Sequence, residues 1–187
     1  MNASQIPNDP LESSPKHHAL RLKEAGEFVF ELLKIVLISL AIIIPVRHFL
    51  IQPFYVKGAS MEPNFQDHEY LVVDEISYRF HEPARGEIIV FRAPGEKKLF
   101  FIKRIIGVPG ETVELRGGKV YIKGALLSEL NYLSKVVLTL GENKITLKDN
   151  EYWVMGDNRM TSLDSRSFGP IKRDQIVGRA IFLLAIY

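Results

Sequence analysis

A nearly uninterrupted apolar segment near the N-terminus is the feature that most constrains this chain. From Phe28 to Val46 the sequence reads FVFELLKIVLISLAIIIPV, with polar interruptions at Glu31, Lys34 and Ser39. Crossing a bilayer takes roughly 20 apolar residues, so this length suits a membrane span. Glu31 and Lys34 can pair one turn apart and reach the lipid headgroups. The segment therefore predicts a transmembrane helix over residues 27–50.

Two other interpretations of this segment are open. A cleavable signal peptide would lie closer to the N-terminus and would be followed by a small-x-small cleavage site, which is missing after this segment. A buried amphipathic helix would have a polar face, whereas residues 35–46 are apolar on almost every side. Lysine and arginine flank both ends, so the positive-inside rule does not decide the orientation. Residues 1–26, which begin with a polar stretch, are predicted to form a flexible tail.

The composition limits what the rest of the chain can do. The 187 residues leave room for one domain beyond the apolar segment. The formal net charge of +2 provides no basic surface for nucleic acid. The chain has no cysteine, which excludes disulfides, cysteine-based zinc sites and a thiol nucleophile.

Beyond Phe54, short apolar runs alternate with turn residues. Gly117 and Gly118 lie between two such runs and predict a tight hairpin. Strands this short and frequent are typical of a mostly β fold, and they predict an antiparallel, partly closed β-domain over residues 54–187. The predicted strands are Tyr70–Asp74, Glu87–Phe91, Leu99–Ile105, Thr112–Arg116, Lys119–Ile122, Lys144–Leu147, Glu151–Met155 and Gln175–Ala185.

Two residues can be combined into a nucleophile and its base. Ser60 lies in the small-residue turn GASMEP, and Lys103 lies in the apolar run FFIKRIIG. In a strand, Lys103 shares a face with Phe101 and Ile105, so it loses hydration and its neutral form is favoured. A neutral amine can accept the proton of a serine hydroxyl. Taken singly, each residue also fits a plainer role, as a turn serine or as an edge-strand lysine whose stem reaches water.

A third polar element, residues 156–169, directly follows an apolar run and is dense in hydroxyl and charged groups. It fits a solvated loop, or a loop that orients a buried amine. Other catalytic groupings are weaker, because the five histidines form no HExxH pair and no GxSxG elbow occurs. Lys57 precedes Ser60 by three residues, but Gly58 breaks any helix that would bring them together. The sequence contains no phosphate-binding loop and no metal-binding cluster.

Four motifs occur in an order that resembles the bacterial type I signal peptidases, a family of membrane-bound Ser/Lys endopeptidases. They are GASMEPNF, RGEIIVFRAP, FFIKRIIGVPGE and GDNRMTSLDSRSFGPI. The resemblance covers about residues 54–186 and the apolar segment before them. It implies a catalytic β-domain over residues 54–187, with a small hairpin or loop insertion at about 111–150 in place of the large second domain of some members.

The resemblance also implies roles for individual residues. Ser60 matches the nucleophile, Lys103 the general base, and Ser162 the serine that orients the lysine amine. Asp164 and Arg166 match a supporting ion pair, which Arg104 is expected to join. The positions that match the shallow pockets for small substrate side chains are Val56, Met61, Phe65, Phe101 and Ile102.

The chain departs from the family pattern at three of these motif positions. Gly58 stands where some members carry a serine hydroxyl that completes the oxyanion hole. The hole is therefore expected to rely on backbone N–H groups, with that of Ser60 first. Met160 and Thr161 replace an acidic residue and an asparagine, and we expect the site to tolerate both.

The function implied by the resemblance is the removal of signal peptides from exported preproteins, without a cofactor or metal. The implied partners are preproteins and the lipid bilayer, with no nucleic acid, at a place near the secretion translocon. The implied location is the plasma membrane, with a single pass, a cytoplasmic tail and an extracytoplasmic catalytic domain. Two alternatives stay open: a membrane-tethered module that binds signal peptides without cutting them, and a self-cleaving Ser/Lys regulator.

Overall fold

The computed structural model describes residues 15–49, 52–96, 98–133 and 137–182. The chain divides into two compact units, Met1–Pro45 and Val46–Tyr187. Of the predicted tail, residues 1–14 lie outside the described residues, whereas residues 15–26 are helical. The predicted helix therefore begins earlier than expected, at Pro15.

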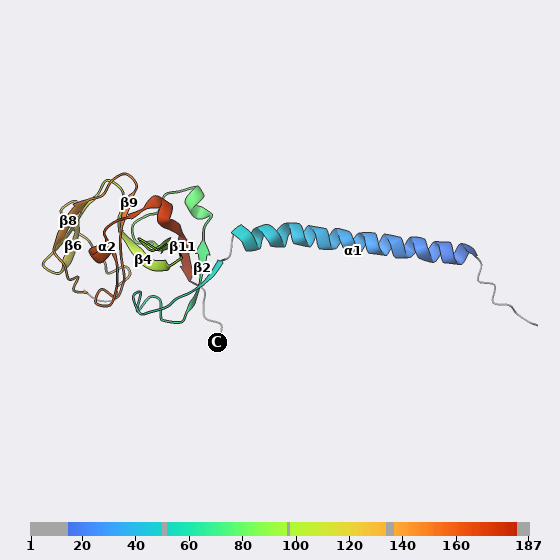
Figure 1. The fold of residues 1–187 in the computed structure, drawn as a ribbon, viewed down its shortest axis with the longest axis horizontal. Coiled ribbons are helices and arrows are strands. Elements are labelled where there is room, and N and C mark those ends of the chain that lie inside the picture. Colours follow the sequence, from blue (N-terminus) through green and yellow to red (C-terminus); the bar gives the residue numbers. More distant parts are fainter. Residues whose placement is uncertain (1–14, 50–51, 97, 134–136, 183–187) are drawn as a thin grey trace, which may run out of the picture. The chain divides into compact units, whose positions relative to one another are not determined.

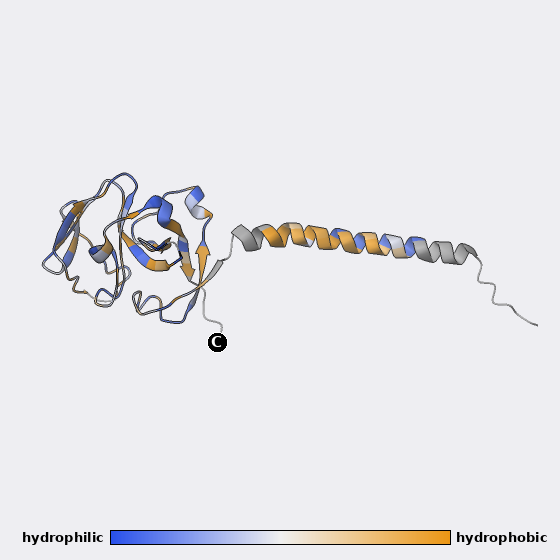
Figure 2. Ribbon diagram, in the orientation of Figure 1, coloured by the Kyte–Doolittle hydropathy of each residue, from blue (hydrophilic) through white to orange (hydrophobic). Residues whose placement is uncertain are grey.

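The described residues of the first unit belong to the helix α1, Pro15–Phe49, which continues through Pro45. Figure 2 shows hydrophobic residues along much of its described length. Large apolar side chains such as Phe28, Ile38 and Ile44 are more than half exposed on it. Among the described residues, no helix reaches the combination of length and apolarity needed for a bilayer span.

The second unit contains a seven-stranded sheet in the order β1-β2-β11-β3-β4-β9-β10 (Figure 1). All of its described strand pairs are antiparallel. Its strands are β1 (Gln52–Tyr55), β2 (Tyr70–Asp74), β3 (Ile88–Arg92), β4 (Phe100–Gly107), β9 (Glu151–Met155), β10 (Ile171–Lys172) and β11 (Ile176–Phe182). Three short helices accompany it: η1 (Ser77–Arg79), α2 (Ser165–Phe168) and η2 (Arg173–Gln175).

A four-stranded antiparallel sheet in the order β7-β6-β5-β8 occupies the part of the chain between β4 and β9. Its strands are β5 (Thr112–Arg116), β6 (Lys119–Ile122), β7 (Ala125–Leu126) and β8 (Asn143–Thr146). Gly117 and Gly118 form the turn between β5 and β6, and both have positive φ, which glycine adopts without strain. The sequence predicted three of these four strands, and β7 is the additional one.

All eight predicted strands are present, shifted by a few residues at their ends; of the last one, residues 183–185 lie outside the described residues. The expectation of a partly closed domain is wrong, because the described strands form two open sheets. Closure requires the first and last strands to pair along their length. Here the edge strand β10 is two residues long and pairs with β9, while β1 pairs with β2.

The strand β4 positions the site because it lies inside the large sheet, between β3 and β9. Its consecutive residues face opposite sides: Ile105 belongs to one buried apolar cluster, and Ile106 belongs to a second that includes Trp153 and the β5–β6 side chains. A third cluster packs Val56, Met61 and Phe65 against β2 and β3. The loop that carries Ser60 therefore rests on the sheet beside β4.

Candidate active site

Lys103 and Ser60 meet at the centre of the candidate site. Lys103 lies in β4 opposite Ile89 of β3 and is only 4% exposed, so the edge-strand interpretation of this lysine is wrong. Its Nζ atom lies 2.8 Å from Ser60 Oγ, and it also donates a hydrogen bond to the Ile102 carbonyl at 2.8 Å. The sheet therefore brings together two residues that are far apart in the sequence, at a distance suited to proton transfer.

The surroundings of Lys103 favour its neutral form. Burial lowers the pKa of Lys103 from 10.5 to about 8, although the negative charges of Asp164 and Asp157 act in the opposite direction. The amine also lies 5.5 Å from the centre of the Phe101 ring. A lysine with this pKa is partly deprotonated near neutral to mildly alkaline pH, and its free amine can accept the proton of a serine hydroxyl.

A cleft of about 360 Å³ opens over this pair, and both Ser60 and Lys103 line it. Three of the predicted pocket residues, Val56, Phe101 and Ile102, line the cleft. The other two do not, because Met61 and Phe65 are buried in the apolar cluster against β2 and β3. The cleft is mainly apolar, as its remaining lining residues are Phe54, Tyr55, Lys57, Leu71, Val90, Leu99 and Phe100.

The Ser60 loop is fixed by hydrogen bonds on both sides. Gly58 has a φ of 98°, and its N–H donates to Asp67 Oδ1 at 2.7 Å. On the other side, the Asn158 N–H donates to the Ser60 carbonyl at 3.1 Å. A Cβ atom on Gly156 would lie 2.5 Å from the same carbonyl oxygen and would also collide with Ser162. Only glycine at position 156 therefore lets the two loops approach so closely.

Asp164 and Arg166 form the predicted ion pair beside the site. Arg166 donates to Asp164 Oδ1 through Nε at 2.8 Å, and the Gly156 N–H donates to Oδ2 at 3.1 Å. Burial raises the pKa of the Asp164 carboxyl, but these hydrogen bonds outweigh burial and hold that pKa below its usual range. Ser162 Oγ is buried and makes no hydrogen bond of ordinary geometry to any described residue, although it contributes to lowering the Asp164 pKa.

The sequence suggested that Arg104 joins the pair of Asp164 and Arg166, and this prediction is wrong. The partner of Arg104 is Asp157. The guanidinium donates to Asp157 through Nε at 2.7 Å and through its second terminal nitrogen at 2.6 Å, and both side chains are buried. Asn64 donates to the same carboxylate at 2.7 Å. The reason is register, because Arg104 lies opposite Met155, the last residue of β9, and Asp157 follows Met155 by two residues.

Arg159 lies in the last of the four motifs and has a structural role that the sequence did not indicate. Its buried side chain donates to the Gly156 carbonyl at 3.0 Å and pairs with Glu129. No local pattern linked Arg159 to Glu129, which precedes it by thirty residues. By contrast, the unusual residues Met160 and Thr161 are exposed, so their substitution leaves these contacts unchanged.

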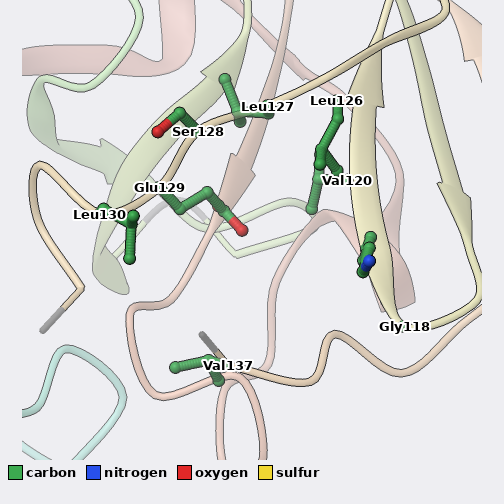
Figure 3. Close-up of a pocket in the computed structure, with 9 residues that line it drawn as sticks. Gly118, Val120, Leu126, Leu127, Ser128, Glu129, Leu130 and Val137 are labelled. Atoms are coloured by element: carbon green, nitrogen blue, oxygen red, sulfur yellow. The ribbon is translucent and has the colours of Figure 1, made fainter. Parts of the chain in front are cut away.

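A second cavity, of about 260 Å³, lies in the part of the chain that forms the small sheet (Figure 3). It is lined mainly by apolar side chains from β6 and from the segment after β7, including Val120, Leu127 and Leu130. Neither Ser60 nor Lys103 lines it. It is therefore separate from the candidate active site.

The fold and site define a β protein with a hydrogen-bonded serine and lysine in an apolar cleft, and comparisons with known proteins identify the family. The family model described as "Signal peptidase, peptidase S26" matches residues 29–185. "Signal peptidase I" of Leptolyngbya laminosa is 35% identical over 182 residues, which cover 94% of this chain and 85% of that protein.

Two further relatives agree. "Signal peptidase I T" of Bacillus subtilis is 38% identical over 161 residues, or 80% of this chain and 82% of that protein. "Probable signal peptidase I-2" of Synechocystis is 37% identical over 155 residues, or 80% of this chain and 70% of that protein. The chain belongs to the signal peptidase family, peptidase S26.

The buried pair of Arg104 and Asp157 leads to a prediction about stability. The Asp157→Asn variant removes the charge that neutralises a buried guanidinium, so we expect the free energy of unfolding to fall by about 3–5 kcal/mol. Denaturant unfolding of the full chain in detergent measures this change. The matched control is Glu114→Gln, which breaks looser pairs with Arg116 at 3.4 Å and Lys144 at 3.7 Å and should cost less than about 1 kcal/mol. Equal losses in the two variants would contradict the special role of the buried pair.

Proposed function

We propose that this chain is a membrane-anchored serine endopeptidase that removes signal peptides from exported preproteins, with Ser60 as nucleophile and Lys103 as general base. The single observation that carries the proposal is the 2.8 Å distance between Lys103 Nζ and Ser60 Oγ in an apolar cleft. The relatives named signal peptidase I support the choice of substrate. Small side chains before the cleaved bond would fit beside Val56, Phe101 and Ile102.

In the proposed reaction, neutral Lys103 accepts the Ser60 proton while Ser60 Oγ forms a bond to the scissile carbonyl carbon. Backbone N–H groups, with that of Ser60 first, stabilise the oxyanion. The peptide C–N bond then breaks, and protonated Lys103 gives its proton to the leaving amine. A water molecule deprotonated by Lys103 hydrolyses the acyl-enzyme and regenerates Ser60. No metal or cofactor enters these steps.

The polar residues around the pair have supporting roles in this proposal. Asp164 and Arg166 hold the Gly156 backbone, and Arg104 holds Asp157 at the start of the same loop. Ser162, whose Oγ atom is buried and without an ordinary hydrogen bond among the described residues, is the group we expect to orient the amine when substrate is bound. Met61 and Phe65 support the cleft from the apolar cluster beneath it.

The proposed membrane attachment rests on α1. Its apolar stretch through Ile44 carries large exposed side chains, which a lipid environment would cover. Signal peptides are themselves apolar and reside in membranes, so an attached enzyme would meet them at a raised effective concentration. We place the domain of residues 54–187 on the extracytoplasmic face of the plasma membrane, near the secretion translocon.

Substitution of either proposed catalytic residue should abolish cleavage. In Ser60→Ala no nucleophile remains, and in Lys103→Ala no base remains, so preprotein processing should fall by at least about a thousandfold. Cleavage of a purified preprotein in detergent, followed by gel electrophoresis, measures the loss. The exposed residues Ser167 and Lys144 provide matched controls, because Ser167→Ala and Lys144→Ala should retain activity. Substantial processing by Ser60→Ala would refute the proposed nucleophile, and preprotein binding without processing by the wild type would support the non-catalytic alternative.

The lowered pKa of Lys103 predicts an alkaline pH dependence. Since only the deprotonated amine accepts a proton, activity should rise with pH through a value of about 8 and then level off. Initial cleavage rates between about pH 6 and pH 10 test this expectation. Lys103→Arg should be inactive throughout, because a guanidinium does not deprotonate in this range. A flat profile for the wild type would exclude Lys103 as the base.

The proposed membrane attachment predicts the behaviour of the full chain in bacterial cells. It should sediment with membranes and resist extraction by high salt, and protease added to spheroplasts should digest residues 54–187. The double variant Ile38→Asp, Ile42→Asp should be released, since each aspartate in a membrane helix costs about 2.5–3.5 kcal/mol. Ile38→Leu, Ile42→Leu is the matched control and should stay bound. Release of the wild type by salt alone would contradict the anchor.

A further inference from the structure

A buried ion pair connects the segment after β7 to the loop that follows β9. Arg159 donates to both carboxylate oxygens of Glu129, to Oε2 at 3.1 Å and to Oε1 through its other terminal nitrogen. The Arg159 side chain is 0% exposed and that of Glu129 is 15% exposed. The guanidinium also donates to the Thr139 hydroxyl, but Glu129 is the carboxylate at ion-pair distance that neutralises it. An unpaired guanidinium at this depth would be strongly unfavourable, so Glu129 helps to determine where the Arg159 side chain lies.

Glu129 is itself held firmly. Figure 3 shows it between Leu127 and Leu130, on the segment that forms one wall of the second cavity. Its carbonyl accepts the Leu133 N–H at 2.9 Å, and its Oε1 accepts the Tyr132 hydroxyl at 2.9 Å. Burial, together with the Glu129 charge, raises the pKa of Tyr132, so this hydroxyl stays a donor. The carboxylate is therefore a fixed point and not a mobile surface charge.

The contacts of Arg159 lead from this fixed point to Ser60. Its Nε donates to the Gly156 carbonyl at 3.0 Å, and its own carbonyl accepts a hydrogen bond from Arg166 at 2.7 Å. The backbone from Gly156 to Arg159 is thus held on one side by the guanidinium. From the same stretch, the Asn158 N–H donates to the Ser60 carbonyl at 3.1 Å. A displacement of Arg159 would therefore reach the loop that carries Ser60.

We propose that Glu129 is a positioning residue for the Ser60–Lys103 pair, which it fixes through Arg159 and the Gly156–Asn158 backbone. This inference rests on the proposed function. Glu129 touches neither member of the pair in any described hydrogen bond, so it acts through the loop and not on the reacting atoms. Through Glu129, the part of the chain that forms the small sheet therefore helps to position the proposed catalytic residues.

The proposal predicts which kinetic constant changes. None of the residues from Gly156 to Arg159 lines the cleft, so substrate binding should be preserved when the loop relaxes. The Ser60 Oγ to Lys103 Nζ distance should be disturbed, and small misplacements of reacting groups cost roughly ten- to hundredfold in rate. We therefore expect kcat to fall by that factor in Glu129→Ala, while KM changes less than about twofold.

The experiment compares full-chain variants in detergent, at a temperature where circular dichroism shows each to be folded. Glu129→Gln keeps the shape of the side chain and should show a smaller loss of kcat than Glu129→Ala, because the amide oxygen still accepts one guanidinium hydrogen bond. If Glu129→Ala does not fold, Glu129→Gln decides alone. Glu114→Gln is the matched control, since Glu114 is 18% exposed and paired within the small sheet without contacts to the loop after β9. Its kcat should equal that of the wild type.

Two results would overturn the proposal. If folded Glu129 variants keep the wild-type kcat and lose only melting temperature, Glu129 merely stabilises the fold. If Glu114→Gln lowers kcat as much as Glu129→Gln does, the effect is not specific to the Arg159 contact. Both results leave the proposed function intact, because the wild type still cleaves preprotein. An inactive wild type, by contrast, would refute the proposed function together with this inference.

Discussion

Two neighbouring cations of β4 govern the organisation of the site. Lys103 and Arg104 are both buried, but they are neutralised in different ways. Arg104 has the bidentate carboxylate of Asp157, whereas no carboxylate within the described part of the chain lies at ion-pair distance from Lys103. A buried arginine cannot lose its proton and needs a partner, while a buried lysine can become neutral instead. The same strand thus carries Arg104, whose permanent charge has a structural role, and Lys103, which can lose its proton and act as a base.

The loop after β9 depends on this arrangement. Arg104 fixes Asp157, and the preceding residue, Gly156, approaches the Ser60 carbonyl and donates its N–H to Asp164. Arg159, at the other end of this segment, pairs with Glu129. Each of these charged side chains is paired, as buried charges must be. Lys103 differs from these side chains, since it is buried and no carboxylate of the described residues lies at ion-pair distance from its amine.

The sequence predicted the strands that carry a clear alternating or apolar pattern, and the structure contains all of them. The strands it missed have no such pattern. β1 contains Pro53, which is unfavourable inside a sheet and is tolerated at an edge, where β1 lies. β7 and β10 are two residues long, too short for any periodicity. Closure of the sheet was not predictable, because it depends on whether the edge strands can pair.

At the site, the four ordered motifs singled out Ser60 and Lys103, whereas the local surroundings of each residue alone also fitted a plainer role. The partner of Arg104 could not be found from the sequence, since it depends on the register between β4 and β9. Met61 and Phe65 were expected in the cleft, but the Phe65 N–H bonds back to the Met61 carbonyl and the turn directs both side chains into the core. Long-range pairing, and not local composition, decided these cases.

The proposed chemistry depends on the register with which β4 pairs with β3 during folding. Ile89 of β3 pairs with Lys103, and Ile88 pairs with Arg104. A slip of one residue would exchange the two faces of the strand and present a guanidinium, with its permanent proton, to the serine hydroxyl. Such a misregistered molecule could keep a sheet of the same outline and yet hold no base at all. The accuracy of strand pairing is thus itself a determinant of the chemistry.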